Sequence, residues 1–169
     1  KTNTCNAMIT NINTSRDILH TSTDYLKDHE VERAIVYMHD NTTETVINTI
    51  STPETIGGAF EYSVNDGFSQ GVNSITYSGK SMTCQVIAIL SVESHTNQDL
   101  AFYVSKNGTI IENSEGFVTT DSGGKATNVV CQTIIDLVNL DEITLEVENY
   151  TSTHNITVDN LSLNIISIH

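Results

Sequence analysis

The chain has 169 residues, which is enough for one domain with its own hydrophobic core. It carries 21 Asp and Glu residues against 7 Lys and Arg, and from Ile56 onward its cations are Lys80, Lys106 and Lys125. Binding to a phosphate backbone or an anionic membrane surface requires clustered cations, so we expect neither partner. No apolar run approaches the roughly 18 residues of a membrane span, so no membrane insertion is expected either.

Residues 1–33 are rich in Asn and Thr and then in charged residues, and we interpret them as an N-terminal linker or stem. A weak helical period passes through Ile18, Ser22, Tyr25 and His29. Because only half of these positions are apolar, the pattern favours a stem that gains order from neighbouring chains over a stable helix. The chain begins with Lys rather than Met, so we expect a processed or trimmed product.

Residues 34–169 have the pattern of short strands separated by turns. Residues 35–38 and 45–47 are predicted to form a hairpin, and Pro53 marks a break after it. Further strands are predicted at residues 60–64, 73–78, 81–93, 126–137, 143–147 and 156–165. The last of these changes its apolar phase near Asp159-Asn160, which predicts a β-bulge.

Residues 100–111 contain the strongest local signal, two apolar runs joined by Asn107-Gly108. This pair favours a type I′ turn, because both of its residues tolerate positive φ. The turn sets the register, so that Lys106 pairs with Thr109 and Ser105 lies opposite Ile110. Two faces follow from this register: Leu100, Phe102, Val104 and Ile111 on one, and Ala101, Tyr103 and Ile110 on the other.

Three cysteines are present, Cys5, Cys84 and Cys131, without a CxxC motif or zinc-type spacing. Cys84 and Cys131 share the phase of the apolar residues in their strands, so we interpret both as buried core thiols. A disulfide bond between Cys84 and Cys131 is compatible with the sequence if their strands face each other.

The whole pattern predicts an all-β fold, an antiparallel β-sandwich of jelly-roll type over residues 34–169. No helix of normal length is expected in residues 31–169. Three of the strands are apolar in both phases, so a sheet that contains them is covered on both sides. Loops, distorted edges or the N-terminal segment are one source of that cover, and other copies of the chain are another. The candidate oligomer-interface residues are Ile87, Ile89, Tyr103, Ile110, Val130 and Ile134.

Three segments carry a resemblance to a known family: FYVSKNGTIIENS, VVCQTIIDLVNLDEITLEVEN and NITVDNLSLNI. They resemble the C-terminal jelly-roll domain of phage and other virus structural proteins, which is related in fold to the complement globular-head and tumour-necrosis-factor trimers. The resemblance covers about residues 34–169. The family usually has Gly or Asn before the Asp of the last connection, whereas this chain has Leu140 before Asp141.

This resemblance implies a homotrimeric domain on the virion surface, and hence an extracellular one, as part of a fibre, spike or capsid decoration. Its expected partners are further copies of the chain, other virion proteins, and a host receptor or glycan. The expected role is particle stability or host attachment, and no residue is singled out for receptor binding.

The sequence contains no motif that indicates catalysis or cofactor binding. No nucleophile, phosphate-loop or calcium-loop motif occurs, and the six histidines are scattered. We therefore expect no enzyme, no catalytic or metal-binding residues and no cofactor. Two other roles stay open, a secreted recognition ligand of the same fold and a carbohydrate-binding module. The absence of Trp weakens the second, because sugar platforms use stacked aromatic rings.

Overall fold

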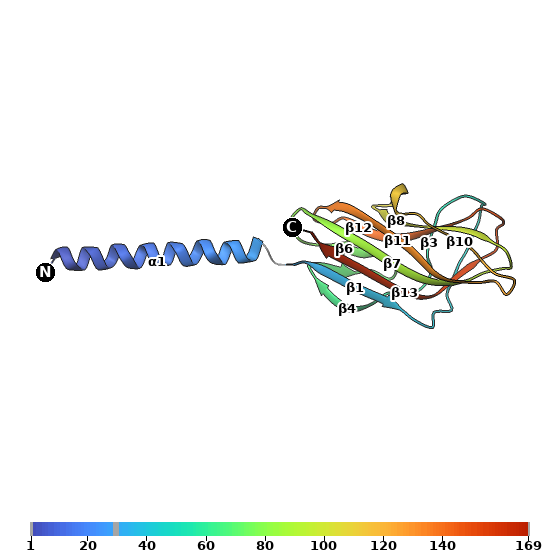
Figure 1. Cartoon of the computed structure of the whole chain (residues 1–169), viewed down its shortest axis with the longest axis horizontal. Coiled ribbons are helices and arrows are strands. Elements are labelled where there is room, and N and C mark those ends of the chain that lie inside the picture. Colours follow the sequence, from blue (N-terminus) through green and yellow to red (C-terminus); the bar gives the residue numbers. More distant parts are fainter. Residues whose placement is uncertain (1, 29–30, 169) are drawn as a thin grey trace. The chain divides into compact units, whose positions relative to one another are not determined.

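The computed structural model describes residues 2–28 and 31–168, and it divides into two compact units that meet between Val31 and Glu32. The N-terminal unit is helical, and the second unit is a β-sandwich (Figure 1). The boundary that the sequence places after residue 33 falls at the first residue of the first strand.

The helix α1 (Thr2–Asp28) has 27 residues. The sequence pattern gave little weight to a helix here, and in this respect it is wrong, whereas a stem that is ordered by neighbouring chains stays a prediction. Neither Gly nor Pro interrupts this stretch, and Thr14 and Thr21 donate their hydroxyl groups to the carbonyls of Thr10 and Asp17, one turn earlier. All described side chains of the helix, at residues 8–22, are exposed.

The first sheet has one long path of five strands, with a short strand beside it. In spatial order these are β11 (Lys125–Leu137), β7 (Met82–Glu93), β13 (Ile156–Ser167), β1 (Arg33–Met38) and β4 (Glu61–Asp66), while β2 (Glu44–Thr45) pairs with β13. All of these pairings are antiparallel.

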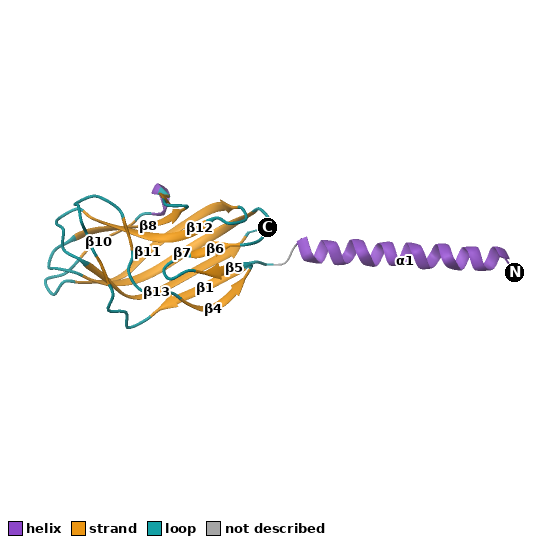
Figure 2. Cartoon of the chain, turned by 180° about the vertical axis from the view of Figure 1, so that it is seen from behind, coloured by secondary structure: helices purple, strands orange, loops and turns teal. Residues whose placement is uncertain are grey.

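The second sheet packs against the first across the core, and Figure 2 shows the chain from the side opposite to Figure 1. Its path is β10 (Gly116–Thr119), β8 (Asp99–Lys106), β12 (Glu142–Asn149), β6 (Ile75–Tyr77) and β5 (Phe68–Gln70), with β3 (Glu54–Thr55) on β12 and β9 (Thr109–Ile110) on β8. The fold is the antiparallel jelly-roll sandwich that the sequence predicts. In the described part of this unit the only helix is the 3₁₀ turn Glu112–Ser114, as expected.

The core lies between the two sheets and is filled by the inward phase of each strand. Cys84 and Cys131 are both fully buried and free, which confirms their prediction as core thiols. They belong to neighbouring strands of one sheet, so the bond left open by the sequence is not formed. Burial raises the pKa of each thiol to about 12.

The predicted turn at Asn107-Gly108 is confirmed. Both residues have positive φ, 53° and 73°, and Lys106 pairs with Thr109. The predicted bulge in β13 is also present, as a shift of register between Val158 and Asn160.

The predicted hairpin of residues 35–38 and 45–47 is wrong. Strand β1 instead pairs with β13 and β4, and β2 pairs with the start of β13. The apolar period within each segment is compatible with either partner. Strands β13 and β4 pair with both edges of β1, whereas a hairpin arm would pair with one edge alone.

Asp141 fastens the turn of the β8–β9 hairpin to the connection between β11 and β12. One carboxylate oxygen accepts a hydrogen bond from the Asn107 side chain at 2.7 Å, and the other accepts one from the Val138 N–H at 2.9 Å. Lys106 Nζ lies 3.6 Å from the second oxygen. Leu140 before it has φ +74° and an exposed side chain. A leucine therefore occupies the left-handed conformation that Gly or Asn adopts more easily.

We expect Asp141→Asn to destabilise the sandwich at neutral pH by about 1–3 kcal/mol. Burial raises the pKa of Asp141. The hydrogen bonds from Val138 and Asn107 and the charge of Lys106 together lower this pKa by more, so the net shift is downward. The carboxylate thus stabilises the fold above its unfolded-state pKa, about 4, and this contribution is lost as pH falls through the folded-state pKa.

Urea unfolding of the two proteins at several pH values checks this prediction. The gap in unfolding free energy between native protein and Asp141→Asn should narrow below about pH 4. Asp40→Asn is the matched control, since the Asp40 side chain is 94% exposed. A gap that stays constant down to pH 2 would contradict the assigned role of the Asp141 carboxylate.

Candidate functional site

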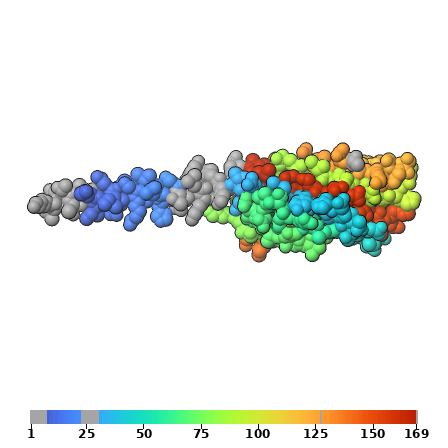
Figure 3. Space-filling model, turned by 90° about the horizontal axis from the view of Figure 1, so that it is seen from below, coloured from blue at the N-terminus to red at the C-terminus, as the bar shows by residue number. Residues whose placement is uncertain are grey.

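The side of the first sheet that points away from the core forms one continuous surface, which we call the outer face. The backbone pairing arranges its side chains in three cross-strand rows. From the β4 edge to the β11 edge the rows are Glu61, Tyr37, Ser162, Ile89 and Val130; Val64, Ile35, Asn164, Ile87 and Gln132; and Asp66, Arg33, Ile166, Gln85 and Ile134. Figure 3 shows β13, in red, running along this face beside the light-blue atoms of β1.

Large apolar side chains stand exposed on the outer face. The exposed fractions are 44% for Ile89, 43% for Val130, 60% for Ile134 and 42% for Ile166. Ile87 is half-buried in the same surface. Single exposed apolar residues are common on proteins, but a contiguous group on neighbouring strands is typical of an interaction surface.

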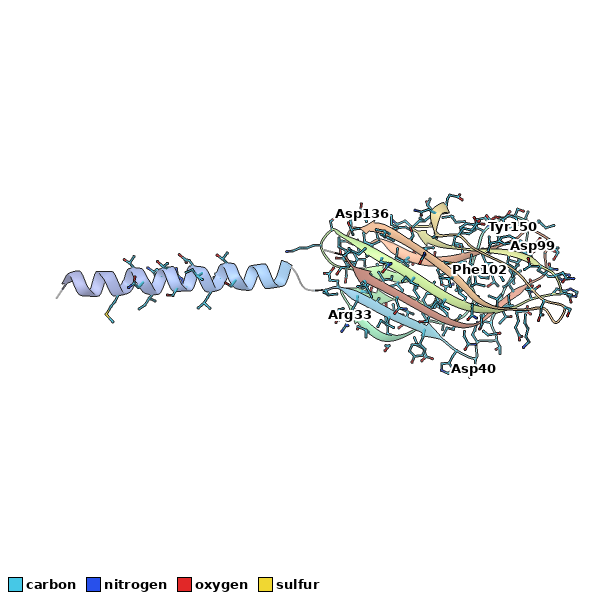
Figure 4. The ribbon with its side chains drawn as sticks, in the orientation of Figure 1. Arg33, Asp40, Asp99, Phe102, Asp136 and Tyr150 are labelled. Atoms are coloured by element: carbon cyan, nitrogen blue, oxygen red, sulfur yellow. The ribbon has the colours of Figure 1, made fainter. Side chains whose placement is uncertain are left out.

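Charge is confined to the margins of the outer face. Arg33 and Asp66 form an ion pair of 3.4 Å at the β1–β4 edge. At the β11 edge Asp136 accepts a hydrogen bond of 2.6 Å from the Thr83 hydroxyl. Figure 4 shows Arg33 and Asp136 at the same end of the sandwich. The outward positions of β7 from Thr83 to Ser91 hold no charged residue, although the chain has a net charge of −14.

This pattern fits a protein contact. The central part of a protein interface is depleted of charged residues, because their desolvation is costly. The outer face offers apolar groups and neutral amides and hydroxyls in its middle. It is therefore the best candidate for a functional surface on the described part of the sandwich.

Four of the six interface residues predicted from the sequence lie together on the outer face. Ile87 and Ile89 come from β7, and Val130 and Ile134 from β11, with Ile89 directly opposite Val130. The other two, Tyr103 and Ile110, lie in the second sheet. The two-faced strands are therefore divided between the two sheets, and no single sheet contains them all. Strand periodicity shows that both faces of a strand are apolar, but not which strands become neighbours.

Tyr103 needs no second copy to cover it. Its side chain is only 4% exposed, and its hydroxyl lies 3.0 Å from the Tyr150 hydroxyl. Burial raises the pKa of Tyr103. The turn Glu112–Ser114 lies against the same strand, where Ser114 accepts a hydrogen bond from the Val104 N–H. Ile110, on the two-residue β9, keeps part of its surface exposed.

A second apolar patch occupies the edge where the two sheets meet at β10 and β11, and we call it the edge pair. Phe117 is 57% exposed, and its ring stacks on that of Tyr150 with centroids 6.4 Å apart. Gly116 permits the close approach of the sheets here, since a Cβ at this position would lie 2.5 Å from the Val130 carbonyl oxygen. Figure 4 shows Tyr150 toward the end opposite Arg33.

Several residues of these two surfaces were not predicted from the sequence. On the outer face these are Ile35, Tyr37 and Ile166, and at the edge Phe117. A usable signal existed for the first two, because the run AIVYM of β1 is apolar in both phases. Phe117 gave no such signal, since its strand has four residues and little period.

The described residues show no arrangement that suggests metal chemistry. No group of three or more His, Cys, Asp or Glu side chains among them is placed to hold a metal ion. The His95 and His154 rings stack with centroids 4.1 Å apart in the loops. None of the helices described is long and apolar enough to cross a membrane.

Comparisons with known proteins agree with the fold. No protein-family model matches the chain, and no curated protein matches it. Among solved structures, the PRD1 vertex protein P5 has a TM-score of 0.54 at 14% identity, over 83% of this chain and 99% of that one. Murine APRIL at pH 5.0 has a TM-score of 0.53 at 8% identity, over 81% and 100%.

Eiger TNF from S. frugiperda has a TM-score of 0.53 at 10% identity, over 82% of this chain and 94% of that one. At identities this low the likeness establishes a common jelly-roll fold. Neighbours with this fold include both a vertex protein and a TNF.

Proposed function

We propose that the chain is a non-enzymatic virion structural protein, a homotrimeric surface domain that stabilises the particle or attaches it to a host. The observation that carries the proposal is the outer face. Ile89 and Val130 lie exposed beside each other, and Ile134 and Ile166 lie exposed two rows away, on a sheet whose middle lacks charge. Burial against further copies of the chain removes this apolar surface from water.

A closed trimer requires two different patches on each copy. In a threefold ring the surface of one subunit meets another surface of the next, so face and counterpart are distinct. The outer face is one of them, and the edge pair of Phe117 and Tyr150 is the candidate for the other. Ring closure then uses both apolar patches of every copy and leaves neither exposed.

The fold likeness supports the trimer and the role. The chain resembles virus structural domains related in fold to complement and tumour-necrosis-factor trimers, and one solved structure with this fold is a PRD1 vertex protein. We place the domain, within this proposal, at the virion surface, with other virion proteins and a host receptor or glycan as partners. The end of the sandwich opposite Arg33, where Asp99 lies, is the candidate for the exposed tip (Figure 4).

A secreted recognition ligand is the second candidate. The likeness in fold to murine APRIL and to Eiger TNF favours it. Both candidates use a trimer, so oligomeric state does not separate them. The gene environment does separate them, because a virion protein is encoded among capsid or tail genes.

Two measurements test the proposal. Light scattering of the full chain should give three times the monomer mass of 18.5 kDa at micromolar concentration. Mass spectrometry of purified particles encoded by the same genome should then detect the chain at a fixed ratio to the capsid protein. A monomer at every accessible concentration would refute the trimer. A trimer that is absent from particles, and whose gene carries a secretion signal, would refute the virion role in favour of the ligand.

A further inference from the structure

The helix α1 lacks the usual sources of helix stability. Twelve of its 27 residues are Thr, Asn or Ser, which are weak helix formers. Isolated helices in water are marginal even when their composition is favourable, and most helices in proteins are held by packing of an apolar face. The described side chains of α1, residues 8–22, are all exposed. A helix of this kind requires a partner that covers it.

Its apolar residues mark the face that such a partner would cover. Met8, Ile12 and Leu19 are 63%, 65% and 67% exposed. With Ser15 and Ser22 they follow one another at intervals of 4, 3, 4 and 3 residues, which is the heptad spacing of a coiled coil. We call these five residues the heptad stripe.

The chain continues the heptad stripe in both directions. Cys5 precedes Ile12 by seven residues, and Leu26 follows Leu19 by seven. No charged residue occupies either repeating position from Cys5 to Leu26. Arg16 and Asp17 lie off the stripe and pair with each other at 3.7 Å. Like charges therefore do not oppose close approach of identical helices along this stripe.

We propose that α1 is one helix of a parallel coiled coil, which it forms with the α1 helices of two other copies of the chain. In the proposed trimer the helices run parallel, because each ends at Asp28, five residues before β1 of its own copy begins at Arg33. A trimer of sandwiches holds the three helices at a millimolar effective concentration, which favours their pairing. The number three rests on the trimer proposed above, whereas the heptad stripe stands independently of it.

The small residue Ser15 fits this packing. A shallow hollow on the helix surface lies over it and is lined by Asn11, Ile12, Ser15, Arg16 and Leu19. In a coiled coil each apolar side chain enters a space between residues of the facing helix, and this hollow offers such a space. Because Ser15 is close in size to Cys, Ser15→Cys places a thiol at the helix contact with little change in packing.

Disulfide trapping in the full chain tests the proposal. In a Cys5→Ser background, Ser15→Cys is oxidised with copper phenanthroline, so that two thiols lose their hydrogens and join between copies. Asn13→Cys is the matched control, since it lies two residues away and off the heptad stripe. Cys84 and Cys131 do not interfere, because both are fully buried. We expect the linked dimer to be about tenfold more abundant for Ser15→Cys than for Asn13→Cys.

Circular dichroism at 222 nm gives a second measurement, because α1 supplies the long helix of the described chain. Ile12→Asp with Leu19→Asp should remove most of the helical signal, whereas Asn13→Asp should preserve it. If the mass is that of a trimer but trapping is equal at residues 13 and 15, or the double variant keeps its helix, the coiled coil is refuted and the trimer of sandwiches stands. If Ser15→Cys is trapped selectively in a species that is not a trimer, the pairing stands and the number three fails. A monomer without selective trapping refutes both proposals.

Discussion

Replacing Ile89 by Asp is expected to convert the trimer into folded monomers. Ile89 lies in the middle of the outer face, opposite Val130 on one side and Ser162 on the other. In the trimer a carboxylate at this position is buried without a cation, at a cost of about 3–5 kcal/mol for each of the three contacts. Each 1.4 kcal/mol changes an equilibrium constant about tenfold, so assembly should fail at micromolar concentration.

The monomer itself should tolerate Ile89→Asp. The side chain is 44% exposed in the single chain, so the loss within the sandwich is about 1 kcal/mol, from strand propensity and packing. Light scattering measures the mass, and far-ultraviolet circular dichroism measures the sheet. Val72→Asp is the matched control, because Val72 is 72% exposed and lies between β5 and β6, away from the outer face. Retention of a full trimer by Ile89→Asp would show that the outer face is not the contact.

Replacing Tyr103 by Asp is expected to unfold the sandwich rather than to separate its copies. Tyr103 is buried in β8, which lies between β10 and β12. The new carboxylate would be buried near the negative charges of Glu115 and Glu148, which already act on the Tyr103 hydroxyl. Burial of an unpaired charge, with loss of the ring, should cost more than about 4 kcal/mol, a large part of the stability of a domain.

Two related variants separate the causes. Tyr103→Phe removes only the hydroxyl contact with Tyr150, at a cost of about 1 kcal/mol. Ile110→Asp changes a half-exposed side chain on the short β9 and should leave the sandwich folded. Urea unfolding followed by circular dichroism ranks the three proteins. A folded, monomeric Tyr103→Asp would mean that Tyr103 lies at the contact between copies after all.

These two substitutions test two residues that share one sequence pattern but differ in what covers their side chains. Ile89 and Tyr103 both lie on strands that are apolar in both phases. For Tyr103 the second cover comes from Tyr150 and the turn Glu112–Ser114 of its own chain. For Ile89 the described part of the chain leaves 44% of the side chain open. Only the exposed side chain of Ile89 needs another copy of the chain to cover it.

Several features were determined by local sequence alone. Asn107-Gly108 specified its turn and the pairing of Lys106 with Thr109, because positive φ at two successive residues permits few alternatives. The alternation around Cys84 and Cys131 placed both thiols in the core. The phase change before Leu161 located the bulge in β13. Each of these features depends on a few consecutive residues, so it can be predicted from the local sequence.

The tertiary structure decided which strands became neighbours. Tyr37 lies opposite Ser162, and Val64 opposite Ile35, across long stretches of chain. An apolar period predicts which side chains of a strand are buried, but it does not predict which other strand packs against them. That choice depends on the combined burial of all the strands at once. The outer face, which joins residues of β1, β7, β11 and β13, therefore exists only in the folded chain, because its rows are made by long-range pairing.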